Sequence, residues 1–151
     1  MCNKDDKQIE ELSNLWHAIL NESKYRRIEE KYKRLNELTT IEIGIIKIIS
    51  QKEDVMIKEI CLILQIPKST LTNAINRLEK RNYIKRVISK KDRRSFGLEL
   101  TESGKLVQQE HIDFEKYIYG QFLNSLDTYE EREELLKLLG KIACNYSKLK
   151  M

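Results

Sequence analysis

The chain has 151 residues, with 28 Lys or Arg against 24 Asp or Glu, so its formal net charge is +4. Five glycines and one proline are too few for an all-β protein built from many tight turns, and no apolar run is long enough to span a bilayer. The first residues lack the apolar core of a secretion signal, and three cysteines without a C-x-x-C pair favour no disulfide framework, so we expect a soluble cytoplasmic protein rich in helix.

The first predicted helix covers about residues 6–36, where apolar side chains recur at helical spacing without an intervening glycine or proline. Its stripe consists of Ile9, Leu12, Trp16, Ile19 and Leu20, followed by Ile28, Tyr32 and Leu35. A helix of this length cannot bury its stripe inside so small a domain, so we expect it to pack against a second subunit.

A second helix is predicted over residues 40–51, because Thr39 and Glu42 have the spacing of a capping box. A short strand over 54–56 and a third helix over 57–64 follow. The third helix ends at an interruption that contains the single proline of the chain.

The fourth helix, over residues 68–81, begins directly after Pro67, whose missing N–H would be unpaired there in any case. Its apolar face consists of Leu71, Ala74, Ile75 and Leu78. The opposite face carries small hydrogen-bonding side chains, where a merely solvated helix would usually carry Glu and Lys. Asn82 is predicted to end the helix in the left-handed conformation.

Two strands, over 83–88 and 95–100, are predicted to form a hairpin, because apolar and polar residues alternate in the second strand. The connection between them, residues 89–94, is longer than a tight turn and heavily basic. Two short helices joined by a tight turn, followed by a hairpin with a basic tip, are the pattern of a winged helix-turn-helix.

Two long helices complete the chain. One covers residues 101–123 and is opened by Thr101, and the other covers 128–149 and is opened by Asp127 with Glu130. The last helix has an apolar stripe of Leu135, Leu138, Leu139, Ile142 and Tyr146.

The predicted fold class is therefore mainly α with a small β-hairpin wing (α+β). Residues 37–100 are expected to form the winged helix-turn-helix DNA-binding lobe. The long N- and C-terminal helices, within residues 1–36 and 101–151, are expected to form the helical dimerisation region of the same intertwined domain.

The basic residues are concentrated between Pro67 and Ser95, where ten stand against two acidic residues. This segment carries a net charge of +8 and leaves −4 for the rest of the chain. Such clustering is the electrostatic footprint of nucleic-acid binding, although a solvated lysine-rich face is the alternative.

The fourth helix fits the major groove of DNA, roughly 12 Å wide, and offers side chains to base edges. We predict contacts from Lys68, Ser69, Thr70, Thr72, Asn73, Asn76 and Arg77. The two asparagines would pair with adenine, Arg77 with guanine, and the methyl group of Thr70 or Thr72 with thymine. Lys68 and Ser69, at the start of the helix, would contact phosphate. The wing residues Lys90, Lys91, Asp92, Arg93 and Arg94 would reach the flanking minor groove.

A plainer interpretation stays open for several of these cations. Arg77, Lys80 and Arg81 could be ordinary solvated helix residues. Lys85 and Arg86 could simply protect the edge of the hairpin.

Residues 57–109 resemble the MarR family, the multiple-antibiotic-resistance regulators. The most specific match is Asp92-Arg93-Arg94 followed by Leu98-Glu99-Leu100-Thr101-Glu102-Ser103-Gly104, which corresponds to that family's D-x-R wing motif and its L-x-L-T-x-x-G motif. The runs Ser69-Thr70-Leu71-Thr72 and Leu78-Glu79-Lys80 are similar to its recognition-helix signature.

The resemblance implies a dimeric transcriptional regulator whose first helix and last two helices form the interface. It also implies that Arg94 enters the minor groove, that Asp92 orients it by a charge-assisted hydrogen bond, and that Arg93 contacts phosphate. Such a homodimer would bind a pseudo-palindromic double-stranded DNA operator with half-sites about one helical turn apart. Gln65 and Asn82 stand where the family has glycine, and asparagine tolerates left-handed backbone better than glutamine.

Members of such a family usually repress transcription until a ligand or oxidation releases them, so we expect a repressor released by a small aromatic or amphipathic effector. Trp16, Tyr25 and Tyr32 are candidates for lining its pocket, although aromatic residues at helical spacing more often serve packing. A thiol-based redox sensor is the alternative. The peroxide-sensing branch of the family uses a cysteine near the start of its first helix, and the chain has no cysteine between positions 2 and 61, so such a sensor could act only through Cys2. Cys61, on the buried face of its helix, and Cys144, beside the last apolar stripe, are expected to be small hydrophobes.

Enzymatic activity is not expected, because the chain lacks phosphate-loop, dinucleotide-binding and zinc-protease motifs and has two histidines. Its histidines, cysteines and acidic residues show no metal-ligand spacing, so neither a metal nor a cofactor is expected. The other class left open is a winged-helix adaptor whose basic residues meet an acidic partner protein.

Overall fold

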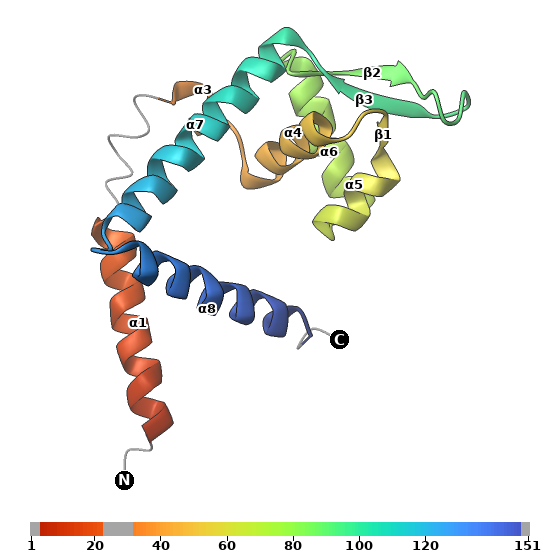
Figure 1. Cartoon of the computed structure of the whole chain (residues 1–151). Coiled ribbons are helices and arrows are strands. Elements are labelled where there is room, and N and C mark those ends of the chain that lie inside the picture. The colour runs from red at the N-terminus through yellow and green to blue at the C-terminus, as the bar shows by residue number, and fades with distance from the viewer. Residues whose placement is uncertain (1–3, 23–31, 149–151) are drawn as a thin grey trace. The chain divides into compact units, whose positions relative to one another are not determined.

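The computed structural model of the chain describes residues 4–22 and 32–148 (Figure 1). Its elements are α1 (Lys4–Glu22), α3 (Lys33–Asn36), α4 (Thr40–Gln51), β1 (Val55–Met56), α5 (Ile57–Leu64), α6 (Lys68–Lys80), β2 (Ile84–Ile88), β3 (Phe96–Leu100), α7 (Glu102–Asn124) and α8 (Tyr129–Lys148). They belong to two compact units, residues 1–110 and 111–151, and α7 contributes to both. The architecture is mainly helical with one small sheet, as predicted.

The helices of the helix-turn-helix begin where local sequence predicts, and α6 ends at Lys80, one residue before its predicted end. α4 begins after Thr39, whose hydroxyl accepts a hydrogen bond from the Glu42 N–H at 3.3 Å, while the Glu42 carboxylate accepts one from the Thr39 N–H at 2.8 Å. α5 and α6 start at the predicted residues as well. The capping box and the position of Pro67 were therefore sufficient signals for these starts.

Two non-glycine residues adopt the left-handed conformation at helix ends. Gln65 closes α5 with φ 52° and ψ 42°, and Asn82, after α6, has φ 59°. The Asn82 N–H bonds to the Glu79 carbonyl and the Tyr83 N–H to the Leu78 carbonyl, the Schellman arrangement that satisfies the last carbonyls of a helix. The cap predicted for Asn82 is confirmed, and Gln65 takes a conformation that favours glycine.

The strands form a three-stranded antiparallel sheet in the order β1-β3-β2. β3 is central, because its Leu98 pairs with Val55 of β1 and with Arg86 of β2. Figure 1 shows the β2–β3 hairpin projecting from the lobe that contains α4, α5 and α6. The predicted hairpin is confirmed, and the predicted short strand supplies the third strand of its sheet.

The hydrophobic core lies between α4, α5, α6 and the sheet. Its fully buried side chains include Ile45, Ile46, Val55, Ile60, Leu71, Ile75, Leu78 and Leu98. The apolar face predicted for α6 is the face that enters this core, so the polar face of the same helix is left on the surface.

The start of α7 is fixed to the end of α6. The Thr101 N–H donates to the Tyr83 carbonyl at 3.1 Å, and the Thr101 hydroxyl donates to the Asn82 carbonyl. That hydroxyl also accepts from the Gly104 N–H at 3.0 Å, which caps the helix as predicted. A Cβ on Gly104 would lie 1.9 Å from the Tyr83 carbonyl oxygen, so only glycine fits this approach.

The prediction of one continuous helix over residues 6–36 is wrong at its C-terminal end. α1 is described as far as Glu22, residues 23–31 lie outside the described ranges, and Tyr32 has the non-helical angles φ −115° and ψ 55°. Tyr32 and Leu35 are buried, and this tertiary packing outweighs the helical propensity of the segment.

The cap predicted for the last helix is wrong by one residue. The Thr128 hydroxyl accepts from the Glu131 N–H at 3.2 Å, and the Glu131 carboxylate accepts from the Thr128 N–H at 3.1 Å. This pair satisfies two N-terminal donors reciprocally, which Asp127 with Glu130 does not, so α8 begins at Tyr129.

Both α1 and α8 expose apolar side chains in the single chain. They are Ile9, Leu12, Leu15, Trp16, Ile19 and Leu20 on α1, and Leu136, Leu138, Leu139, Ile142 and Tyr146 on α8. Large exposed apolar faces of this kind mark interaction surfaces. Within residues 4–22 and 32–148, no helix combines the length and apolar character needed to cross a membrane.

Candidate nucleic-acid interface

The outer face of α6 presents short polar side chains on a rigid helix. Lys68, Ser69, Thr70, Asn73, Asn76 and Arg77 are exposed, whereas Thr72 is half-buried. The Thr72 hydroxyl donates to the Lys68 carbonyl at 2.8 Å, so a contact from Thr72 to another molecule would use its methyl group. Asn73 has no side-chain hydrogen bond within the described ranges, which leaves both ends of its amide available.

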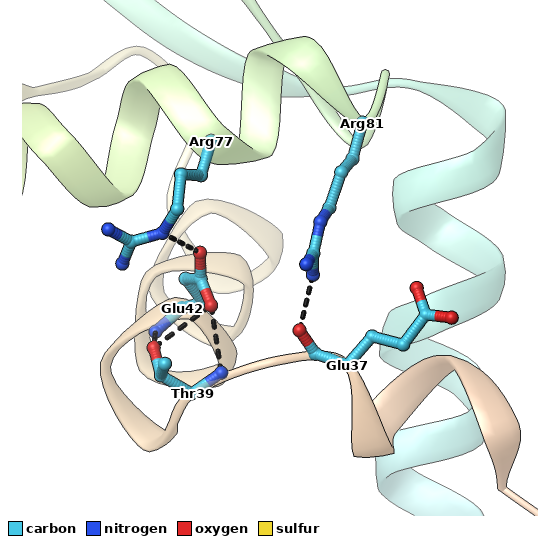
Figure 2. A network of polar contacts seen from close by, with 5 residues as sticks. All are labelled: Glu37, Thr39, Glu42, Arg77 and Arg81. Atoms are coloured by element: carbon cyan, nitrogen blue, oxygen red, sulfur yellow. Dashed lines mark hydrogen bonds and ion pairs between the residues drawn. The ribbon is translucent and has the colours of Figure 1, made fainter.

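Arg77 is tied to the start of α4 by a buried carboxylate (Figure 2). Its Nε donates to Glu42 Oε1 at 2.8 Å, and Glu42 is only 1% exposed. Desolvation raises the pKa of Glu42, but hydrogen bonds from Thr39 and Arg77 outweigh this and hold it below its usual value. Figure 2 shows the two terminal amino groups of Arg77 pointing away from Glu42, so a contact to guanine would have to use these two groups.

Arg81 anchors the other end of α6. Its guanidinium donates to the Glu37 carbonyl in the turn before α4, as Figure 2 also shows. Together with Arg77, it fixes the direction of α6 relative to α4. These two arginines are thus not simply solvated, which removes the plainer interpretation of both.

Arg86 crosses from β2 to α6. Its Nη2 donates to Asn76 Oδ1 at 2.9 Å, and its Nε donates to Glu79 Oε2 at 3.1 Å. The alternative in which Arg86 only protects the edge of the hairpin is therefore wrong. Its neighbour Lys85 instead pairs with Glu99 of the adjacent strand, at 3.3 Å.

The wing turn is organised by Asp92. Its carboxylate accepts from the backbone N–H of Arg94 at 2.9 Å and from the Ser95 hydroxyl at 2.7 Å. These two bonds, the Arg94 N–H first, lower the pKa of Asp92. The expected bond between the side chains of Asp92 and Arg94 is not the one formed: Asp92 positions Arg94 through its backbone and leaves the guanidinium exposed.

The base of the wing connection is held by Asp54 and Ser89. Ser89 is 1% exposed, and its hydroxyl donates to Asp54 Oδ2 at 2.8 Å while accepting from the Lys91 N–H at 3.1 Å. Asp54 Oδ2 also accepts from the Lys91 N–H, and the Lys91 ammonium donates to the Asp54 carbonyl. Lys91 is therefore partly committed to the wing itself, whereas Lys90, Arg93 and Arg94 have no side-chain partner within the described ranges.

Sequence reasoning missed Asp54 and Ser89, although Gly97 offered a signal. A Cβ at Gly97 would lie 2.4 Å from Asp54 Oδ1, and a glycine inside a strand often marks such a close approach. Asp54 also has a left-handed backbone, with φ 49°. Desolvation raises the pKa of Asp54, but bonds from Ser89, Lys91 and Lys90 outweigh it and keep the pKa low.

The residues predicted to line an effector pocket are spread over different environments. Trp16 is 55% exposed on α1, Tyr32 is buried beside α3, and Tyr25 lies outside the described residues, as does Cys2. Cys61 is half-buried and Cys144 exposed. The described part of the chain contains no group of three His, Cys, Asp or Glu side chains that could hold a metal ion.

Comparison with known proteins agrees with this geometry. A model of the MarR family matches residues 37–95. The uncharacterized HTH-type transcriptional regulator YpoP of Bacillus subtilis (strain 168) is 32% identical over 108 residues, which are 70% of this chain and 74% of YpoP. The HTH-type transcriptional regulator PecS of Dickeya dadantii (strain 3937) is 35% identical over 83 residues, which are 52% of this chain and 47% of PecS.

The fold is similar to solved structures over nearly the whole chain. The crystal structure of Streptococcus pneumoniae FabT in complex with DNA has a TM-score of 0.77 and 25% identity to this chain. The alignment covers 93% of this chain and 99% of FabT. The similarity therefore extends beyond the winged helix-turn-helix lobe to the flanking helices.

Proposed function

This chain belongs to the MarR family of transcriptional regulators, and we propose that it is a homodimeric repressor that binds a pseudo-palindromic DNA operator. One observation carries the proposal. The segment between Pro67 and Ser95, which contains α6 and the wing, bears ten basic residues against two acidic ones. The outer face of α6 also offers hydrogen-bonding side chains, such as that of Asn73, that have no partner within the described part of the lobe. The fold similarity to FabT, solved in complex with DNA, supports the same conclusion.

The proposed contacts follow from which groups are available. Lys68 and Ser69 stand at the N-terminus of α6, where backbone N–H groups also favour a phosphate. Asn73 keeps both its amide donor and its acceptor, the combination that reads adenine in the major groove. Arg93 and Arg94, exposed on the wing, would meet the flanking phosphates and the minor groove.

A second copy of the chain is the proposed partner of the exposed apolar faces on α1 and α8. A twofold dimer presents two copies of α6 and therefore favours an operator with two similar, inverted half-sites. The centres of the half-sites should lie about 10 base pairs apart, or one helical turn.

We further propose that a small aromatic or amphipathic effector releases the repressor, with Trp16, Tyr25 and Tyr32 as candidate contacts. Such a ligand would raise the Tm of the free protein by mass action and lower its operator affinity. Trp16→Ala should abolish both effects, whereas Tyr129→Ala, at another exposed aromatic residue, should not.

The proposal is tested by selecting bound sites from random double-stranded DNA with the purified full chain. We expect enrichment of an inverted repeat with the spacing given above. Binding should weaken steeply as salt increases, because each phosphate contact releases counterions. Salt-sensitive retention of DNA without any sequence preference would contradict the proposal and would favour the adaptor for an acidic partner.

A further inference from the structure

We infer that Arg86 sets the base preference of Asn76, so that Asn76 acts on DNA as a hydrogen-bond donor and selects acceptor-rich base edges in place of adenine. The inference rests on the proposed function, because it concerns which base α6 reads. It also separates two asparagines of the same helix face that sequence alone cannot tell apart.

The direction of the Arg86 side chain is fixed by the sheet. Arg86 pairs with Leu98, and Ile84, two residues earlier on the same strand, pairs with Leu100. Ile84 and Leu98 are both buried, so this face of the hairpin is the one turned toward the core. Arg86 therefore extends toward α6, where it meets Asn76 at 2.9 Å and Glu79 at 3.1 Å.

The chemistry of the guanidinium fixes the orientation of the amide. Arginine has five N–H donors and no acceptor, so the group that faces it must be the carbonyl oxygen of Asn76. The amide NH₂ is then the group left for another molecule. The Glu79 carboxylate accepts a hydrogen bond from the Nε of the same guanidinium, which keeps this group in place beside Asn76.

This arrangement disfavours adenine at the base that Asn76 contacts. A bidentate pair with adenine needs the asparagine oxygen to accept from N6 while its NH₂ donates to N7. The oxygen is already engaged, and the adenine amino group would approach a cation. Guanine O6 and N7 and thymine O4 are acceptors, and both the NH₂ of Asn76 and the neighbouring guanidinium attract them.

Asn73 provides the internal comparison. It lies one helical turn earlier on the exposed face of α6 and has no side-chain hydrogen bond within the described ranges. It therefore keeps the acceptor that Asn76 has lost and remains competent to pair with adenine. One helix thus presents two asparagines with opposite preferences.

The experiment compares sites selected from random DNA by the wild-type chain, Arg86→Ala and Lys85→Ala. Asn76→Ala first identifies the operator position that depends on Asn76, because preference there should relax. At that position the wild-type chain should prefer guanine or thymine. Arg86→Ala should shift the preference toward adenine by about tenfold, the discrimination typical of one good base contact.

Lys85→Ala is the matched control, because it removes one positive charge from the same strand without a contact to α6. It should leave the preference unchanged, as should Arg86→Ala at the position read by Asn73. In an Asn76→Ala background, Arg86→Ala should no longer change the preference. Adenine preference in the wild-type chain, or an unchanged preference in Arg86→Ala, would overturn the inference and leave DNA binding intact.

A measurement without DNA tests the contact itself. Arg86→Ala should move the side-chain amide resonances of Asn76 in a ¹⁵N-edited NMR spectrum and leave those of Asn73 in place, and Lys85→Ala should move neither. Unmoved Asn76 resonances would overturn the inference. Failure of the wild-type chain to enrich any sequence would instead overturn the proposed function.

Discussion

The Ser89 hydroxyl donates a hydrogen bond to the Asp54 carboxylate at 2.8 Å, although the two residues are 35 positions apart in the chain. The bond joins the approach to β1 with the first residue after β2, and the same hydroxyl accepts from the Lys91 N–H. The wing connection is therefore held at its base by β1 as well as by its own hairpin partner. The position of the wing arginines depends on this attachment.

Ser89→Ala should destabilise the lobe by about 1–3 kcal/mol, because it leaves buried polar groups without a partner. Urea unfolding measures this loss, and the amide hydrogens of the wing turn should exchange faster. Ser50→Ala is the matched control, since within the part of the chain that the structure describes its exposed hydroxyl bonds to the Lys47 carbonyl alone. Equal effects of the two changes would contradict a special role for Ser89.

The free energy of unfolding should fall with acidification, because the Glu59 carboxylate is protonated and loses its charge. The Lys52 ammonium and the Met56 N–H lower the pKa of Glu59 from 4.5 to about 2. A lowered folded-state pKa contributes stability that is fully present above pH 4.5 and is lost as the pH falls toward 2. Glu59→Gln should thus be less stable than the wild-type chain at pH 7.

The difference in stability between Glu59→Gln and the wild-type chain should shrink between pH 4.5 and 2, because the wild-type Glu59 carboxylate takes up a proton in this range. Thermal unfolding across this range measures the change. Glu53→Gln is the control, because Glu53 is exposed and has no hydrogen bond in the described ranges. A difference that stayed constant down to pH 2 would rule out Glu59 as the cause.

Arg94→Ala should weaken operator binding by about 1–3 kcal/mol and reduce the salt dependence of binding. The reason is that its guanidinium is exposed on the wing turn and, under the proposed function, would contact the DNA. Lys116→Ala removes one exposed positive charge from α7 and should leave the affinity unchanged. Unchanged affinity of Arg94→Ala at matched salt would exclude the wing from the interface.

Gln65→Gly should raise the free energy of unfolding by up to about 1 kcal/mol. The left-handed backbone at Gln65 costs a non-glycine residue about 1–2 kcal/mol. Glycine avoids this cost but loses about 0.5–1 kcal/mol more in chain entropy on folding, so the net gain is smaller. Asn82→Gly should gain less, because asparagine tolerates this conformation. Circular dichroism against temperature gives both values, and a loss of stability at Gln65 would indicate that its side chain makes compensating contacts.

Local signals in the sequence were enough to predict most elements. Thr39 with Glu42 marked the start of α4, and Thr101 the start of α7, because capping depends on residues three positions apart. The buried face of α6 followed from periodicity. The non-helical backbone of Tyr32 did not, because its apolar spacing fits a helix although the residue is buried in the folded chain.

The candidate site was predictable as a set of residues but not as a set of contacts. Asn73 and Asn76 look equivalent in the sequence. Only the packing of β2 beside α6 brings Arg86 to Asn76. The pairing of Arg77 with Glu42 likewise joins residues 35 positions apart. Such contacts depend on tertiary geometry, which neither periodicity nor composition encodes.

The approach of Gly104 to the Tyr83 carbonyl has a mechanical consequence. The first turn of α7 is held against Asn82 and Tyr83, the two residues that follow the C-cap of α6, by this contact and by two hydrogen bonds from Thr101. The first turn of α7 therefore packs directly against the turn that ends α6. Under the proposed function, α6 would face the DNA, and a shift in the first turn of α7 would then be passed to the C-terminal end of α6 through this contact.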